Sequence, residues 1–310
     1  MQAWTAGFTS RQPGVTVNYD PVGSGGGRDQ FLSGGTDFAG SDAALTDDEV
    51  TKAKSRCGSG GYFELPDYIS PIAVVYNLPG VKDLQLSPDT AAEIFKGTIT
   101  TWNDPAIKAD NPGAKLPSTK ITPVHRSDDS GTTKNFTDWL HQTAPSVWTE
   151  AAGGTWPLSG GEAGAQTSGM VAAVKGGQGT IGYADDSQAA GLGVAKIKVG
   201  SDYIAPSAEA AAKVVSNSQG VSGRGQYDHA LNLNRTTSDS SEYPLVLVSY
   251  HIGCLQYQDK NTADMMKAFF TYVVSKDGQQ SAAQSAGSAP ISDSARQTAM
   301  QAITAIKAAS

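Results

Sequence analysis

The chain contains few of the residues on which metal and redox chemistry depend. Its 310 residues include only two cysteines and four histidines, and the histidines lack the mutual spacing of metal ligands. Cys57 and Cys254 lie far apart and form no Cys-x-x-Cys motif, so they are either one disulfide or two buried thiols. The sequence therefore gives no indication of a metal site, and neither does it indicate a thiol redox centre.

Positive charge and long apolar runs are also scarce. Lysine and arginine number 23 against 30 acidic residues, a net charge of -7 that argues against nucleic acid or an anionic membrane as partner. No run approaches the ~18 to 20 apolar residues of a membrane span. The first residues have neither the basic nor the apolar region of a secretory signal. Either the protein is cytosolic, or the sequence begins after its export signal.

What is abundant describes a folded α/β protein. Hydrophobic residues make up 39%, charged residues 17%, and the length suffices for two lobes. Apolar runs at 69–76 and 245–250 predict buried strands, and stripes over 266–274 and 292–307 predict helices. Residues 15–19 alternate as a strand does. Because strands and helices alternate, we expect largely parallel sheets, with most of 200–240 as surface loop.

The most informative stretch is 126–140, which reads Arg-Ser-Asp-Asp-Ser-Gly-Thr-Thr and continues into a helical pattern. It places Arg126, Ser130, Gly131 and Thr132 at a helix N-terminus, where unpaired N–H groups and the dipole favour an anion. The guanidinium adds a planar fork of donors that matches a tetrahedral oxyanion. The alternative is an ordinary capped helix beside a solvated arginine.

A second glycine-rich helix start occurs at residues 23–28. Ser24 lies among four glycines, but no Gly-Lys-Ser/Thr follows, and the dinucleotide spacing is absent. The flanking sequence also lacks the first glycine of a hydrolase nucleophile elbow. Further on, Asp42 lies between a short strand and a helix that begins with a capping box at Thr46. Neither feature by itself identifies a ligand or a cofactor.

Taken together, these segments resemble a known family. The glycine loop at 23–27 and the segments Asp-Phe-Ala-Gly-Ser-Asp (37–42), Arg-Ser-Asp-Asp-Ser-Gly-Thr (126–132) and Gly-Thr-Ile-Gly-Tyr (179–183) occur in the family's order and spacing. The chain resembles, over nearly its full length, the extracytoplasmic phosphate-binding protein of the high-affinity phosphate ABC transporter. The resemblance implies an α/β, two-lobe periplasmic-binding-protein (type II) fold whose lobes close on phosphate.

The resemblance also implies which parts of the chain do what. One lobe is expected at residues 1–70 plus 245–310 and the other at 71–244, joined by hinge crossovers near Asp67 and Tyr243. The implied phosphate ligands are Ser24, Asp42, Arg126, Ser130, Gly131 and Thr132, with Asp128 pairing the arginine and with no catalytic residue, metal or cofactor.

Two further expectations follow from the resemblance. Cys57 and Cys254 flank strands that should be neighbours in the first lobe, so we expect a disulfide between them, as suits an exported protein. The family's first strand, with its glycine-rich turn, has no counterpart in the sequence. We therefore expect the gene product to begin upstream of Met1 with that strand and an export signal, and a lipid anchor there is a further option.

The predicted function is capture of inorganic phosphate outside the cytoplasm and its delivery to a membrane permease. Phosphate near neutral pH carries a proton, so Asp42 would accept it and repel fully deprotonated sulfate. One alternative is a binding protein for another oxyanion, such as sulfate or molybdate. The other is a secreted phosphatase with Ser24 or Ser130 as nucleophile, for which the sequence shows no base.

Overall fold

The computed structural model describes residues 1–309, and these form two compact units. Unit 1 comprises Met1–Ile69, Ser218–Asn232 and the chain from Val248 onward, and unit 2 comprises Ser70–Asn217 and Leu233–Leu247. This division differs from the expected one at residues 245–247, expected in the first lobe and found in unit 2, and at Ser218–Asn232, expected in the second lobe and found in unit 1. The Tyr62 hydroxyl donates to Asp228 over 2.5 Å, and Glu64 exchanges backbone hydrogen bonds with Tyr227 and His229, which fastens that segment to unit 1.

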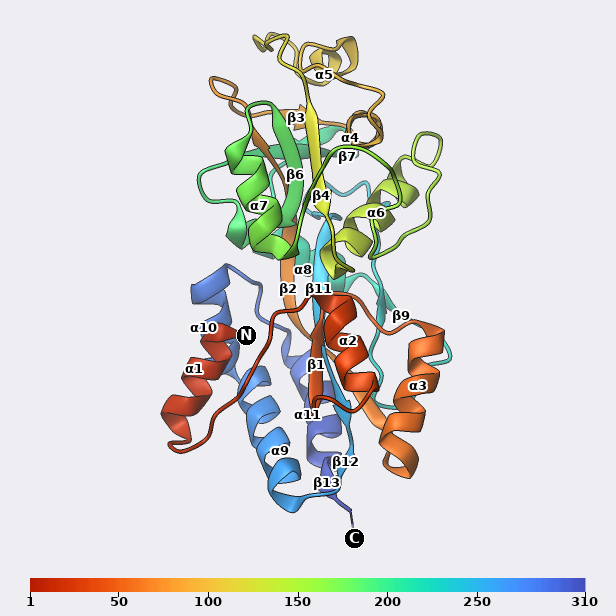
Figure 1. Cartoon of the computed structure of the whole chain (residues 1–310), viewed down its shortest axis with the longest axis vertical. Coiled ribbons are helices and arrows are strands. Elements are labelled where there is room, and N and C mark those ends of the chain that lie inside the picture. Colours follow the sequence, from red (N-terminus) through yellow and green to blue (C-terminus); the bar gives the residue numbers. More distant parts are fainter. Residues whose placement is uncertain (310) are drawn as a thin grey trace. The chain divides into compact units, whose positions relative to one another are not determined.

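Unit 1 consists mainly of helices around a short piece of sheet, in which β1 pairs antiparallel with β11 (Figure 1). Its elements are α1 (Gln2–Arg11), α2 (Ser24–Leu32), β1 (Phe38–Ser41), α3 (Asp47–Cys57), the 3-10 turn η1 (Gly58–Gly60), β9 (Gln219–Gly220), β10 (Leu231–Asn232), β12 (Gln256–Tyr257), α9 (Lys260–Val274), α10 (Lys276–Ala286), α11 (Asp293–Ala305) and β13 (Lys307–Ala308). Edge-to-face aromatic pairs fill its core, with Phe270 5.2 Å from Phe63 and 5.5 Å from Phe38 between ring centroids.

Unit 2 has a mixed sheet flanked by helices. Its elements are β3 (Gln85–Leu86), α4 (Pro88–Lys96), α5 (Pro105–Asp110), β4 (Thr122–Arg126), α6 (Gly131–Thr143), β5 (Glu162–Gly164), α7 (Gln166–Gly176), β6 (Thr180–Asp185), the 3-10 turn η2 (Asp186–Gln188), β7 (Gly193–Val199), β8 (Asp202–Ile204) and α8 (Ala208–Ser216). Two long strands, β2 (Tyr62–Asn77) and β11 (Val246–Cys254), contribute residues to both units. The helix predicted to follow residue 130 is confirmed as α6, and its Phe136, Trp139 and Leu140 are fully buried.

The expectation of largely parallel sheets is wrong. β4 is parallel to β5 and β6, but β2 is antiparallel to β6 and β7, and β1 is antiparallel to β11. Helical crossovers make neighbouring strands parallel. The partners in these antiparallel pairs are instead far apart in sequence, so none of the pairs is a single strand–helix–strand unit.

One local expectation is corrected and another is refined. Residues 15–20 form neither strand nor helix, although their pattern alternates. The stretch 200–240 is mostly loop, as expected, but it also contains α8, whose N-cap Ser207 hydroxyl accepts the Ala210 N–H at 3.2 Å, and the buried Arg235. Arg235 donates to the carbonyls of Pro244 and Val246 at 2.9 and 2.7 Å, a role that no sequence period reveals.

The disulfide expected between Cys57 and Cys254 is confirmed. It joins the last residue of α3 to the last residue of β11, with a Cα–Cα distance of 5.3 Å. The link closes a loop of 197 residues in sequence, so it ties the early and late parts of unit 1 together.

Candidate functional site

The first candidate site lies in unit 2 where β4 ends and α6 begins, and we call Arg126, Asp128, Ser130, Gly131 and Thr132 the α6 site. Ser130 is the N-cap, and its hydroxyl accepts the Thr133 N–H at 3.2 Å. Ser130 is 1% exposed and Thr132 is 4% exposed. Within residues 1–309, no group accepts the backbone N–H of Gly131 or Thr132. The start of α6 thus presents buried donors without a protein acceptor.

Arg126 is held beside this helix start by Asp128. Its Nε–H donates to Asp128 Oδ1 at 2.8 Å, one Nη donates to the other carboxylate oxygen, and Nη1 donates to the Thr167 hydroxyl at 3.3 Å. A guanidinium has five N–H groups, so two of those on Arg126 make no bond to the described residues. The side chain is 5% exposed, which makes the remaining donors strongly attractive to an anion.

Asp128 is itself fixed by two neighbours. Its Oδ1 also accepts the Gln166 N–H at 2.9 Å, at the first residue of α7. Partial burial alone would raise the pKa of the Asp128 carboxyl, but the hydrogen bonds from Arg126 and Gln166 together lower it below its ordinary value. The carboxylate therefore stays ionised and orients the guanidinium.

The second candidate site lies in unit 1, and we call Ser24, Asp42 and Ser249 the α2 site. Ser24 is the first residue of α2 and follows Gly23, whose φ of 86° favours glycine. The Ser24 hydroxyl accepts the Asp42 N–H at 3.0 Å, which leaves its own hydrogen to donate. Asp42 Oδ1 accepts the Ser249 hydroxyl at 2.5 Å. A helix-start donor and an acidic acceptor therefore lie side by side.

A buried arginine locks the frame of the α2 site. Arg28, on α2, donates to Glu49 at 2.8 Å and to the Ser41 hydroxyl at 3.0 Å. Glu49 also completes the predicted capping box with Thr46, which is confirmed. Burial raises the pKa of the Glu49 carboxyl, but hydrogen bonds from Arg28 and Thr46 lower it overall. These bonds join α2, α3 and β1, on which Ser24 and Asp42 depend for their positions.

The histidines form no metal site within residues 1–309. Two of the histidines have other roles. His251 Nδ1 lies 2.5 Å from Asp67 Oδ2, and the ring of His125 stacks on that of Trp156 with 5.1 Å between the ring centroids. Among residues 1–309, no group of three or more histidine, cysteine or acidic side chains is arranged to hold a metal ion. None of the described helices α1 to α11 combines the length and apolar character that a membrane crossing requires.

Comparison with known proteins identifies the family. The model of the PBP superfamily domain matches residues 1–277. Phosphate-binding protein PstS 2 of Mycobacterium tuberculosis is 36% identical over 99% of this chain and 84% of its own length. PstS 3 of the same organism is 37% identical over 96% of this chain and 81% of its own length. The chain belongs to the PstS family. Phosphate-binding protein PstS of Xylella fastidiosa is 33% identical over 86% of this chain and 73% of its own length.

Solved structures confirm the fold class expected for this family. A high-affinity periplasmic phosphate-binding protein, solved with phosphate bound, has a TM-score of 0.72 at 20% identity and covers 95% of this chain and 90% of its own. A putative phosphate ABC transporter substrate-binding protein from Clostridium perfringens has a TM-score of 0.66 at 16% identity and covers 94% of each chain. At such identities the likeness concerns the fold alone.

The structure distributes the expected ligands of this PstS-family chain over two sets. Arg126, Asp128, Ser130, Gly131 and Thr132 come together in the α6 site. Ser24 and Asp42 come together in the α2 site, where Ser249 joins them. Sequence reasoning missed Ser249. Its only signal was a lone small hydroxyl within the apolar run of β11, between the buried Val248 and Tyr250.

Proposed function

We propose that the protein captures inorganic phosphate outside the cytoplasm and delivers it to the membrane permease of an ABC transporter. The proposal rests chiefly on the geometry of the α6 site. There, a buried guanidinium has two N–H groups that bond to none of residues 1–309. It lies next to a helix start with two backbone N–H groups that these residues also leave unbonded. Such a convergence of charged and backbone donors suits a tetrahedral oxyanion. The PstS relatives support phosphate as that oxyanion.

We assign the choice of phosphate to the α2 site. Ser24 supplies a hydroxyl donor, and Asp42 supplies an acceptor for the proton that phosphate carries near neutral pH. The Ser249 hydroxyl donates to Asp42 and orients its carboxylate. Sulfate carries no proton at this pH, so two negative charges would face each other. Asp42 thus favours phosphate over sulfate or molybdate, which is the oxyanion alternative.

The proposal assigns both sets of residues to phosphate. The α6 site supplies donors for the anion, and the α2 site supplies an acceptor for its proton. A phosphatase is the less favoured alternative. The Ser24 and Ser130 hydroxyls both accept hydrogen bonds from backbone N–H groups. Within residues 1–309 neither hydroxyl is hydrogen-bonded to a histidine that could act as base.

The Cys57–Cys254 disulfide supports an oxidising, extracytoplasmic location.

Calorimetric titration of the purified chain tests the proposal. Phosphate should bind with one site per chain and a Kd of about 1 μM or tighter, because several charge-assisted hydrogen bonds converge. Sulfate and molybdate should produce no comparable heat. Turnover of p-nitrophenyl phosphate should be absent. A folded protein without a phosphate isotherm would overturn the proposal, and delivery would be tested by phosphate-dependent uptake through a co-reconstituted permease.

A further inference from the structure

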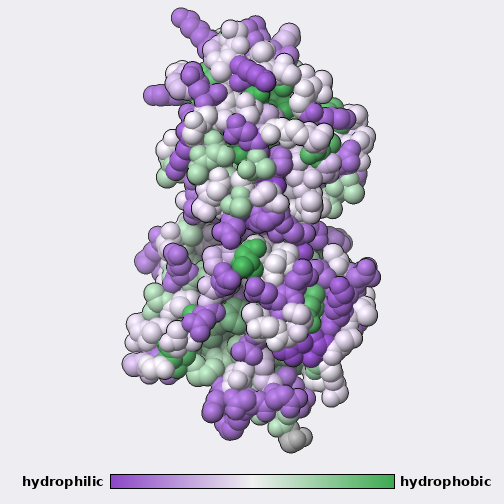
Figure 2. Space-filling model, in the orientation of Figure 1, coloured by the Kyte–Doolittle hydropathy of each residue, from purple (hydrophilic) through white to green (hydrophobic). Residues whose placement is uncertain are grey.

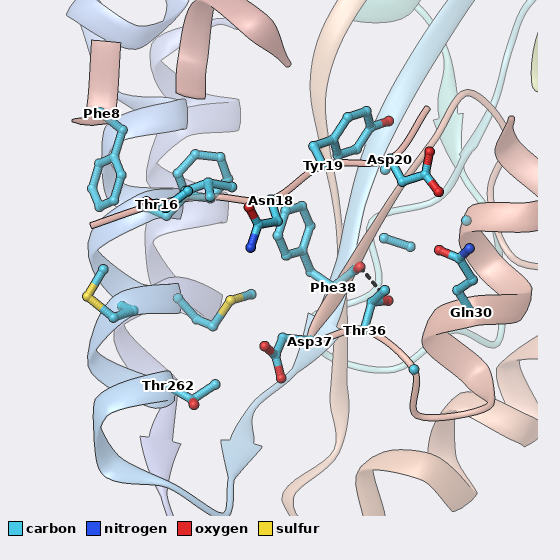
Figure 3. A pocket seen from close by; sticks show the side chains of 18 of the residues that line it. Phe8, Thr16, Asn18, Tyr19, Asp20, Gln30, Thr36, Asp37, Phe38 and Thr262 are labelled. Carbon is cyan, nitrogen blue, oxygen red and sulfur yellow. Dashed lines mark hydrogen bonds between the residues drawn. The ribbon is translucent and has the colours of Figure 1, made fainter. Parts of the chain in front are cut away.

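Unit 1 contains a buried pair of acidic side chains that belongs to neither candidate site. Glu64 of β2 is 0% exposed and Asp228 is 6% exposed, and the two residues are partners in a parallel β-bridge. Figure 2 shows many hydrophilic residues at the surface of unit 1, whereas this pair is hidden from solvent. The cavity of about 810 Å³ in Figure 3 is lined by other residues, which include Asp20 and Asp37. The pair is therefore enclosed by protein.

The contacts of the pair favour one proton between its two carboxyls. The Tyr62 hydroxyl donates to Asp228 Oδ2 at 2.5 Å, and Arg224 Nη1 lies 3.5 Å from the same oxygen. No N–H or hydroxyl group of residues 1–309 donates to the buried Glu64 Oε2, but the Asp228 carboxyl lies within hydrogen-bonding reach of Glu64. Two ionised carboxylates repel each other in such a contact, whereas a protonated one donates to its neighbour.

The pKa of the Glu64 carboxyl is raised well above its ordinary value. Burial is the largest cause, and the charge of Asp228 adds to it. The hydrogen bond from the Leu45 N–H and the charge of Arg224 act in the opposite direction but do not outweigh burial. Glu64 is therefore the member of the pair that keeps the proton near neutral pH.

The other ionisable groups nearby do not replace this proton. Arg224 is shared, because its Nη2 also lies 3.5 Å from Asp47 Oδ1 on the exposed first turn of α3. Burial lowers the pKa of the His229 imidazole, which is therefore neutral at pH 7. Burial and Asp228 raise the pKa of the Tyr62 hydroxyl, which stays a neutral donor. One guanidinium thus faces two buried carboxyls, and a proton balances the charge.

Glu64 and Arg224 also hold the loop that carries Asp42. Residues 42–46 connect β1 to α3. The Leu45 N–H donates to Glu64 Oε1 at 2.8 Å, and the Leu45 carbonyl accepts from Arg224 Nη2 at 2.7 Å. Both backbone groups of Leu45 are therefore bound by side chains that contact Asp228. A change in the charge of Glu64 thus acts on the loop that positions Asp42.

We propose that Glu64 and Asp228 share one proton, and that Glu64 acts through Leu45 as a positioning residue for Asp42. When this proton is released to solvent at alkaline pH, two carboxylates face one guanidinium, and their repulsion displaces the Glu64 oxygen that holds Leu45. The loop of Asp42 then loses its anchor, and phosphate binds more weakly. This link to phosphate rests on the function proposed above for Asp42.

The pH profile of phosphate binding tests the positioning role. Glu64→Gln keeps an oxygen for the Leu45 N–H and offers an amide N–H to Asp228, but it cannot ionise. Calorimetry gives the phosphate Kd of the parent chain and of the variant between pH 6 and pH 9.5. The ratio of the two values cancels the ionisation of phosphate itself. The parent should bind as tightly as the variant at pH 6 and roughly threefold or more weakly at pH 9.5.

Glu242→Gln is the matched control. Glu242 is also buried, at 3% exposed, but it accepts from the Asn217 amide in unit 2 and belongs to neither site. This variant should follow the pH profile of the parent. A ratio of parent to Glu64→Gln that stays constant over the whole range would overturn the positioning role, even if phosphate binds tightly.

Thermal unfolding without phosphate tests the proton separately. The unfolded chain releases the Glu64 proton at its ordinary pKa, whereas the folded chain keeps it to higher pH. The parent should therefore lose stability relative to Glu64→Gln as pH rises from 5 to 9, so that the gap between their Tm values widens. Asp228→Asn removes the repelling charge, should also lose less than the parent, and takes the place of Glu64→Gln if that variant does not fold.

The two measurements distinguish this proposal from phosphate capture. A Tm gap that does not change with pH would disprove the shared proton, whatever the chain binds. A widening gap in a chain that binds no phosphate at any pH would instead overturn phosphate capture and its link to Glu64, while the shared proton would stand.

Discussion

At the residue scale, the proposed phosphate binding depends on two side chains of opposite charge. Arg126 is a donor held in place by Asp128, and Asp42 is an acceptor held in place by Ser249. Both pairs have a functional group and a partner that orients it. The functional groups could be predicted from sequence because each begins or precedes a helix in a recognisable motif. Ser249 could not, because its relation to Asp42 depends on a pairing of strands 207 residues apart.

Replacing Arg126 by alanine should weaken every oxyanion. Loss of charge-assisted hydrogen bonds costs roughly 1.5 to 3 kcal/mol, or about 10- to 150-fold in Kd. Calorimetry on Arg126→Ala measures this directly. Arg11→Ala is the matched control, since Arg11 is exposed, contacts Asp277 and the Tyr272 ring, and belongs to neither candidate site. A phosphate isotherm like that of the parent chain would remove Arg126 from the site.

Asp42→Asn should narrow the preference for phosphate over sulfate more than it changes fold stability. The amide removes the repulsive charge and can itself donate to a sulfate oxygen. Competition of sulfate against phosphate, followed by calorimetry, gives the ratio of the two Kd values. Asp48→Asn, on the exposed first turn of α3, should leave that ratio unchanged. If sulfate stays excluded from the Asp42 variant, another group recognises the proton.

The lowered pKa of the Asp128 carboxyl predicts that the free energy of unfolding depends on pH. Partial burial raises the pKa of its carboxyl, but Arg126 and Gln166 lower it overall, so the folded value lies below the unfolded one. The stabilisation is then present above the ordinary aspartate pKa and is lost as pH falls through the folded value. Urea unfolding between pH 7 and pH 3 should show a smaller acid-dependent loss for Asp128→Asn than for the parent. Identical slopes for the two chains would contradict this.

At the scale of elements, the long and strongly patterned segments were predictable and the short ones were not. The helix α4 is bounded by its Ser87 cap and by Gly97 in the left-handed conformation, end signals that are local in the sequence. The helix α8 was missed, since only Ala211 and Val214 of its nine residues are buried. Residues 15–19 have a strand pattern without a strand, because pairing requires a neighbour that the pattern cannot supply.

The disulfide gives a prediction at the same scale. Reduction should destabilise unit 1 by about 2 to 5 kcal/mol, because the unfolded chain regains the entropy of a long closed loop. Thermal unfolding with and without a phosphine reductant measures the effect. The double variant Cys57→Ser with Cys254→Ser should unfold at the lower temperature and be insensitive to reductant. A parent chain that is equally stable when fully reduced would show that the link contributes nothing.

At the scale of the whole molecule, the sequence predicted a fold of the right class but not all of its organisation. The order of motifs along the chain sufficed for the family. It did not reveal that Ser218–Asn232 belongs with unit 1. That membership comes from the contacts of Tyr62 and Glu64 with residues 227–229, which involve buried polar groups and not a hydrophobic period. Contacts of this kind are decided by packing, so they leave no signal in the local sequence.

If both sets of candidate ligands bind phosphate, as proposed, the anion should protect both helix starts. Ligand that binds only the folded chain stabilises it by about 2.7 kcal/mol at 100 times Kd. Hydrogen exchange with phosphate should therefore slow at the start of α2 in unit 1, over residues 24–27, and at the start of α6 in unit 2, over residues 131–133. Sulfate at the same concentration is the control and should slow neither. Protection confined to one helix start would mean that a single unit holds the anion, and the other set of residues would then need another role.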